Sequence, residues 1–156
     1  MHGHLEIVKY LHSKIKMGLN MNGGYVAYSM IYAASNGFID VIKYLQTCDK
    51  SIDYNAKNLY GETLLTSATF GHQLETVKYL LTLPQININQ TGQDGNTALS
   101  TAAISGDIEI AKVLTKVNGI DINHKNAYNA TPLKLAILHK NIEVSEFLKS
   151  IGCKEE

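Results

Sequence analysis

The sequence contains no arginine and no tryptophan, and only 18% of its 156 residues are charged. All 14 basic residues are lysine, and 14 acidic residues balance them to a net charge of zero. Arginine is the usual residue for forked recognition of phosphate and guanine, and surfaces that bind nucleic acid carry an excess of positive charge. The composition therefore argues against nucleic acid as a partner.

Long apolar runs are missing as well. The longest mostly apolar stretch runs from Tyr25 to Ala34, whereas a membrane-spanning helix needs about 20 residues. The N-terminus lacks the apolar segment of a signal peptide, and two cysteines, Cys48 and Cys153, fit a reducing compartment. We therefore expect one cytoplasmic domain with no membrane partner, whose 45% of hydrophobic residues can form a core.

Motifs that carry catalysis or hold cofactors are also absent. The sequence has no Gly-rich phosphate loop, no His-Glu-x-x-His and no Gly-x-Ser-x-Gly. His2 and His4 are close enough to share a metal ion, but mobile surface histidines are the simpler interpretation. We expect no enzyme activity, no cofactor, no metal and no small-molecule substrate.

What the sequence does contain is an internal repeat of about 34 residues. An acidic residue precedes an apolar helical stripe five times, at spacings of 34, 35, 34 and 34 residues. These acidic residues are Glu6, Asp40, Glu75, Glu109 and Glu143. Regular self-similarity at such a period is the signature of a repeat architecture.

A threonine stands twelve residues before each of the last three acidic residues. The threonines are Thr63, Thr97 and Thr131, and Tyr28 takes that place before Asp40. Threonine can cap a helix, and Pro132 would follow at the first helical position, where its missing N–H is not needed. The spacing predicts a short first helix after the threonine and a second helix along the apolar stripe.

A break between these two helices is expected in each copy. It falls at Gly37, at Gly71 or His72, at Gly106 and at Lys140. Glycine allows the positive φ of such a reversal. In the third copy the glycine comes one place early and leaves His72 at the turn. In the last copy Lys140 replaces the glycine, so we expect Asn141 or an altered turn to absorb the reversal.

Each copy ends in a tetrapeptide with alternating apolar residues, which predicts an extended segment. These tetrapeptides are Leu19–Asn22, Ile52–Asn55, Ile86–Asn89 and Ile120–Asn123. Loops follow them, including one from Asn22 to Tyr28. A single unit of helix, turn, helix and loop cannot bury its own apolar face, so the units must stack.

The pattern resembles the ankyrin repeat, which has a 33-residue period and a Thr-Pro-Leu-His-x-Ala signature. The copy that starts at Thr131 matches this signature best, and the resemblance covers essentially the whole chain. It implies an all-α solenoid of stacked helix-turn-helix units joined by hairpin-like loops, as one domain over residues 1–156. The expected units are a half repeat at 1–22 and repeats at about 23–55, 56–89, 90–123 and 124–156.

The first copy has only its second helix, so the chain opens in mid-repeat, as a fragment of a longer protein or as an unusual half-cap. One position of the second helix is aromatic or apolar in every copy, which predicts a core between the repeats. Its residues are Tyr10, Tyr44, Tyr79, Val113 and Phe147.

The resemblance also implies that an unknown protein partner binds the loop tips and the concave face of the first helices. The candidate residues are Tyr25, Tyr60, Glu62, Phe70, Asp94, Asn96, Ile104, Tyr128, Leu138 and His139. Three of these are loop tyrosines, which could equally pack against their own hairpins. An alternative function is a targeting or regulatory segment of a larger enzyme whose catalytic domain lies outside this chain.

Overall fold

The computed structural model describes residues 5–10, 23–48 and 51–156, leaving aside the side chains of residues 23–25. After a helical segment at residues 5–10 come α2 (Gly23–Ser35), α3 (Ile39–Cys48), α4 (Leu64–Phe70), α5 (Leu74–Leu81), the short 3₁₀ turn η1 (Gln93–Gly95), α6 (Ala98–Ser105), α7 (Ile108–Leu114), α8 (Pro132–Leu138) and α9 (Ile142–Ser150). No strand occurs within these ranges, so the predicted all-α class is confirmed. None of the described helices is both long and apolar enough to cross a membrane.

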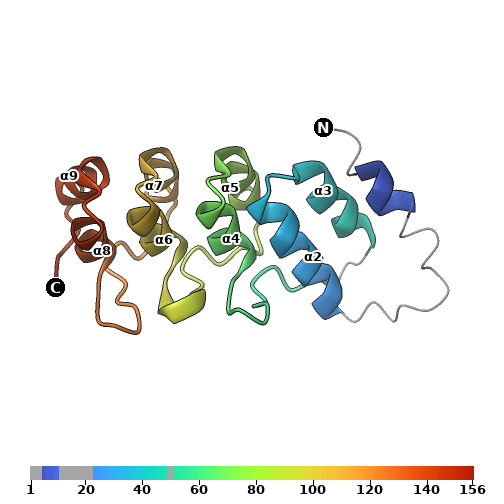
Figure 1. Cartoon of the computed structure of the whole chain (residues 1–156), viewed down its shortest axis with the longest axis horizontal. Helices are drawn as coiled ribbons and strands as arrows, with labels where there is room; N and C mark the ends of the chain where they lie inside the picture. The colour runs from blue at the N-terminus through green and yellow to red at the C-terminus, as the bar shows by residue number, and fades with distance from the viewer. Residues whose placement is uncertain (1–4, 11–22, 49–50) are drawn as a thin grey trace.

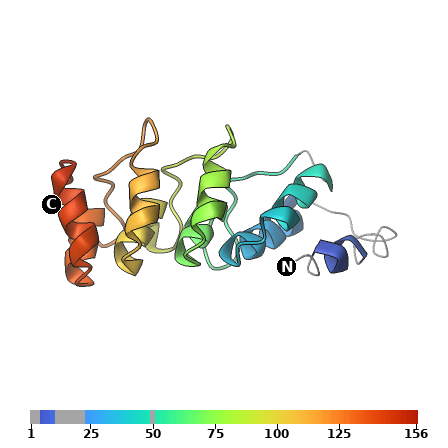
Figure 2. The ribbon, with the colours of Figure 1, turned by 90° about the horizontal axis from the view of Figure 1, so that it is seen from above.

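Helical hairpins stand side by side along the molecule (Figure 1). The first helices form one row, in which α4 packs against α2, α6 against α4 and α8 against α6. The second helices form a parallel row, in which α7 packs against α5 and α9 against α7. The same arrangement is seen from above in Figure 2. The predicted solenoid of helix-turn-helix units is therefore confirmed.

The threonines act as helix caps, as the spacing predicted. The Oγ1 atoms of Thr63, Thr97 and Thr131 accept hydrogen bonds of 3.2–3.3 Å from the backbone N–H groups three residues further on. Pro132 stands at the start of α8. Each cap satisfies a backbone donor that the helix itself cannot pair, so each first helix begins at a residue fixed by the sequence.

The core runs through the stack between the two rows of helices. Ala68, Ala102 and Ala136 of the first helices are fully buried. Such small side chains let successive first helices approach closely. The predicted stripe on the second helices packs against this core at Tyr44, Tyr79, Val113 and Phe147. The prediction is wrong for Tyr10, which is 62% exposed.

The breaks between paired helices fall at all four predicted places. Gly37, His72 and Gly106 have positive φ values of 75°, 57° and 73°. At the fourth, Lys140 itself has a φ of 59° and Asn141 has a φ of −83°, so of the two expected alternatives the reversal at Asn141 is wrong. The Asn141 side-chain amide donates to the carbonyls of Ala103 and Ile104 at 2.8 Å. These bonds hold Asn141 in place and leave the reversal to Lys140, despite the steric cost of a left-handed lysine.

The predicted loop from Asn22 to Tyr28 is also wrong, because α2 begins at Gly23 and is 13 residues long. In Figure 1, α2 extends to the level where the later copies have loops. Tyr28 has no side-chain oxygen near the backbone, so it cannot cap a helix as threonine does. Val26 and Met30, each 1% exposed, continue the helical spacing of buried residues across this position.

The tetrapeptides are not extended throughout, since their last two residues form a turn in each described copy. The cause is a local hydrogen bond from the last backbone N–H to the side-chain oxygen two residues earlier. The bonds run from Asn55 to Asp53, from Asn89 to Asn87 and from Asn123 to Asp121, at 2.9–3.0 Å. The tetrapeptide Leu19–Asn22 lies outside the described residues.

Candidate functional site

Two of the loops between the hairpins are built around an asparagine side chain. The Oδ1 atom of Asn58 accepts hydrogen bonds from the N–H groups of Tyr60 and Glu62, both at 2.9 Å. In the last loop, Asn126 accepts in the same way from Tyr128 and Ala130 at 3.0 Å. These bonds fix the backbone locally and leave the tyrosines at the tips, where Tyr60 is 77% and Tyr128 is 73% exposed.

The middle loop, which contains Asp94 and lies between these two, also forms a tip at this side of the stack, but its turn has a different backbone conformation. Asp94 and Gly95 both have positive φ, 54° and 72°, and the N–H of Asn96 bonds back to the carbonyl of Gln93 at 3.0 Å. The N–H of Ala127 donates to the carbonyl of Asp94 at 2.9 Å. The middle and last loop tips are therefore joined directly and present their side chains next to each other.

Five of the predicted residues line one hollow of about 210 Å³ between α4, α6 and the middle loop. They are Glu62, Phe70, Asp94, Asn96 and Ile104, and they share the hollow with Thr66, Gln93 and Thr101. Phe70 is 66% exposed although it is aromatic. The structure thus brings together residues that the sequence places as far as 42 positions apart.

A neighbouring hollow of about 310 Å³ extends this surface toward α2 and shares Glu62 with the first. Tyr60 lines it from the loop, and Tyr28 and Tyr32 line it from α2. Tyr28 and Tyr32 were not predicted from the sequence, because Tyr28 was aligned with the capping threonines. A signal was available, since residues four apart lie on one face of a helix.

The remaining predicted residues lie at the margins of these hollows or elsewhere. The Tyr128 hydroxyl lies 3.5 Å from Asp94 Oδ1, whereas Leu138 and His139 are exposed at the end of α8 and line neither hollow. Tyr25 lies in α2 and not in a loop, and its side chain is outside the described part of the chain, as are His2 and His4. We call Tyr60, Glu62, Phe70, Asp94, Asn96, Ile104, Tyr128, Leu138 and His139 the loop-side surface.

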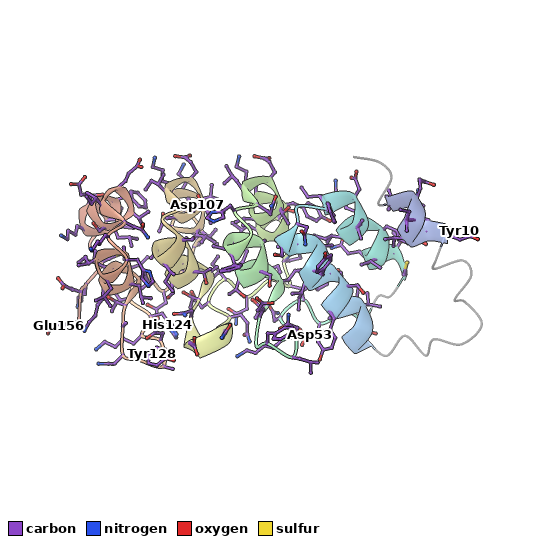
Figure 3. All side chains as sticks on the ribbon, viewed as in Figure 1. Tyr10, Asp53, Asp107, His124, Tyr128 and Glu156 are labelled. Atoms are coloured by element: carbon purple, nitrogen blue, oxygen red, sulfur yellow. The ribbon has the colours of Figure 1, made fainter. Side chains whose placement is uncertain are left out.

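The opposite side of the stack, formed by the second helices, has a different character. Two of its lysines pair with glutamates three residues earlier, at 2.7 Å for Glu75–Lys78 and 2.9 Å for Glu109–Lys112. The hydrogen bond to Glu109 raises the pKa of Lys112, and desolvation by burial raises the pKa of Tyr79. In Figure 3, Tyr128 lies at the loop side and Asp107 toward the second helices.

Asparagines also connect the repeats, a role that was not predicted from the sequence. The Nδ2 of Asn89 donates to the carbonyl of Gly119, and its Oδ1 accepts from the N–H of Asp121, both at 2.8 Å. Asn55 makes the equivalent pair of bonds to Gln85 and Asn87. The signal was the asparagine that ends each tetrapeptide, which bridges to the backbone of the next copy.

One further link between copies involves a histidine. His72 Nδ1 lies 3.2 Å from Asp107 Oδ2, while the other oxygen of Asp107 accepts from the N–H of Ile110 and caps α7. Among the described residues, no group of three or more His, Cys, Asp or Glu side chains is arranged to hold a metal ion. The contact with Asp107 of the next copy places His72 at the join between repeats.

Comparison with known proteins agrees with this geometry. The model of the family described as ankyrin repeats (3 copies) matches residues 1–92 and 64–155, which together span nearly the whole chain. Comparison with curated proteins gives no match. The family match, the row of capped first helices and the stacked hairpins agree, and the chain belongs to the ankyrin-repeat family.

Proposed function

We propose that this chain is a non-catalytic interaction module that binds a protein partner through the loop-side surface. The observation that carries this proposal is the exposure of Phe70 and Tyr60, which line two adjoining hollows, and of Tyr128, whose hydroxyl lies 3.5 Å from Asp94 of the first hollow. Aromatic residues are enriched in protein interfaces because they bury much area with few rotatable bonds. Ankyrin repeats are generally protein–protein interaction modules and are typically non-catalytic.

The second-helix side is a poorer binding surface. Lys78 and Lys112 point their charges into water there, and each already pairs with a glutamate. Lysine is depleted at interface cores because ordering and desolvating its side chain are both unfavourable. We therefore place the partner on the loop-side surface and not on the second-helix side. We further propose that the protein is cytoplasmic and needs no cofactor. Its ligand is a protein, and not nucleic acid, a membrane or a small molecule.

A pull-down from extracts of the source cells tests the choice of side. The bait is the full chain, as the native sequence, as the Tyr60→Ala/Tyr128→Ala variant, and as a Lys78→Ala/Lys112→Ala control. The tyrosines are exposed, so their loss should leave the melting temperature nearly unchanged while binding weakens by ~1–2 kcal/mol or more for each interface anchor. Retention by the tyrosine variant and loss by the lysine control would overturn the proposal.

A further inference from the structure

The acidic residues of the loop-side surface have no counterion among the described residues. Glu62 and Asp94 line the same 210 Å³ hollow, and no lysine or histidine lines it with them. Neither carboxylate forms an ion pair with any described residue, in contrast to Glu75 and Glu109 on the other side. Two uncompensated negative charges at one hollow favour a positively charged group from outside.

Hydrogen bonds within the protein leave these carboxylates capacity to accept more. Glu62 Oε2 accepts from the Asn58 amide at 2.8 Å, and Asp94 Oδ1 has the Tyr128 hydroxyl at 3.5 Å. An ionised carboxylate offers about four lone-pair sites. The bonds to Asn58 and Tyr128 orient the two side chains, and the remaining sites are available to a donor on a partner.

The same hollow has an apolar side. Phe70 contributes a ring that is 66% exposed, and Ile104 from the next first helix is half-buried. An aromatic ring next to two carboxylates suits a guanidinium, which is planar, has five donors and stacks on aromatic faces. A lysine ammonium is a point charge and lacks both the fork and the stacking face.

We propose that the partner inserts an arginine, adjacent in its sequence to an aliphatic side chain, into the hollow between α4 and α6. The arginine bonds to Glu62 and Asp94 over Phe70, and the aliphatic side chain packs on Ile104. This inference rests on the proposed function and names the chemistry of its partner. Because these 156 residues contain no arginine, the inserted arginine comes from a partner sequence outside them, and a second copy of these residues cannot supply it.

The test is selection of random dodecapeptides displayed on phage against the immobilised full chain. We expect enriched peptides to carry arginine next to an aliphatic residue. Their synthetic copies should bind at least about tenfold more weakly to Glu62→Gln/Asp94→Asn, and more weakly when their arginine is replaced by lysine. The control Glu75→Gln/Glu109→Gln removes the same charge from the opposite side and should bind as the native chain does.

The outcomes separate the two proposals. Enriched peptides that lose binding to Tyr60→Ala/Tyr128→Ala but show no preference for arginine would overturn the arginine site and keep the loop-side surface. Peptides that bind every loop-side variant as well as the native chain would overturn both, and failure to enrich any peptide would count against the arginine site. Asparagine tolerates the positive φ of residue 94, so Asp94→Asn should keep the native fold. Melting curves check that each variant is folded.

Discussion

The first helical hairpin, α2 and α3, differs from the three that follow it. Each later first helix begins at a threonine cap, after a loop tied by hydrogen bonds across its ends. The first hairpin has Tyr28 in place of that threonine, and its first helix starts five residues before it. The comparison shows that the cap and the loop, and not the apolar stripe alone, decide where a first helix begins.

The two regions also differ in what covers their apolar residues. Leu99 of α6 and Leu133 of α8 are buried between neighbouring helices. At α2, by contrast, an apolar hollow of about 530 Å³ opens toward residues 5–10, lined by Ile7, Tyr28, Tyr32 and others. Tyr32 is 69% and Ile7 is 59% exposed. As far as the structure describes the chain, the first hairpin is therefore the less completely packed part of the stack.

Among the changes considered, Gly71→Ala should lower the free energy of unfolding most, because Gly71 lies at the junction between the two regions. A Cβ atom at residue 71 would collide with the backbone carbonyl of Ser35 at the end of α2. Backbone cannot move aside as a side chain can, so we expect a loss of about 3 kcal/mol in the free energy of unfolding by urea. Gly119→Ala is the control, with open space and a φ of +82°, and should lose about 1 kcal/mol. Equal losses would contradict the close approach.

Hydrogen exchange measures the same contrast without a mutation. Residues 5–10 pack Leu5 and Val8 against the core but leave Ile7 and Tyr10 exposed. Amides of this segment should exchange at least about 100-fold faster than those of α6 and α7, because few buried contacts oppose its opening. Equal protection of the two regions would show that the terminal helix has a packing partner.

Much of this architecture could be predicted from the sequence, because a repeat multiplies each weak signal. The caps at Thr63, Thr97 and Thr131 were predicted from the place of a threonine in each copy, and the break in the third copy was predicted at Gly71 or His72. The start of α2 was not, because the regular period concealed a copy without a cap. The left-handed Lys140 was missed because its cause, the Asn141 side chain bonded to the preceding repeat, is a tertiary contact.

The sequence allowed several residues of the candidate site to be named, but it did not show how they are arranged in space. Glu62, Phe70, Asp94, Asn96 and Ile104 were identified from their place in each repeat, and the structure gathers them in one hollow. Their shared hollow depends on how α6 packs on α4, which no single copy encodes. The asparagine bridges at Asn55 and Asn89 were missed for the same reason.

The bridges between the later hairpins are tested by Asn89→Ala. The change removes the bonds to Gly119 and Asp121 and leaves two backbone groups without their partner. We expect a loss of about 2 kcal/mol in the free energy of urea unfolding. Asn118→Ala, at an exposed residue whose side chain bonds to no described residue, should change it by less than about 0.5 kcal/mol. If Asn89→Ala and Asn118→Ala changed the free energy of unfolding equally, the Asn89 bonds would not stabilise the stack.

The smallest expected loss of stability comes from removing a threonine cap, which tests the difference between the first hairpin and the later ones. Thr97→Ala should lose about 1 kcal/mol in urea unfolding, because Ser100 N–H loses its acceptor. The converse change, Tyr28→Thr, places a threonine inside α2 and should stabilise nothing, since the helix already passes through residue 28. If Tyr28→Thr instead raised the free energy of unfolding by as much as a new helix cap would, α2 would have to begin at residue 28.

The central claim, that partners bind the loop side of the stack, is tested most directly by photo-crosslinking. A benzoylphenylalanine replaces Tyr128 in one full-length chain and Lys78 in another, and each is irradiated in an extract of the source cells. Both positions are exposed, so each probe can reach a bound protein. We predict a discrete crosslinked adduct from position 128 and none from position 78. An adduct from position 78 alone would contradict the account.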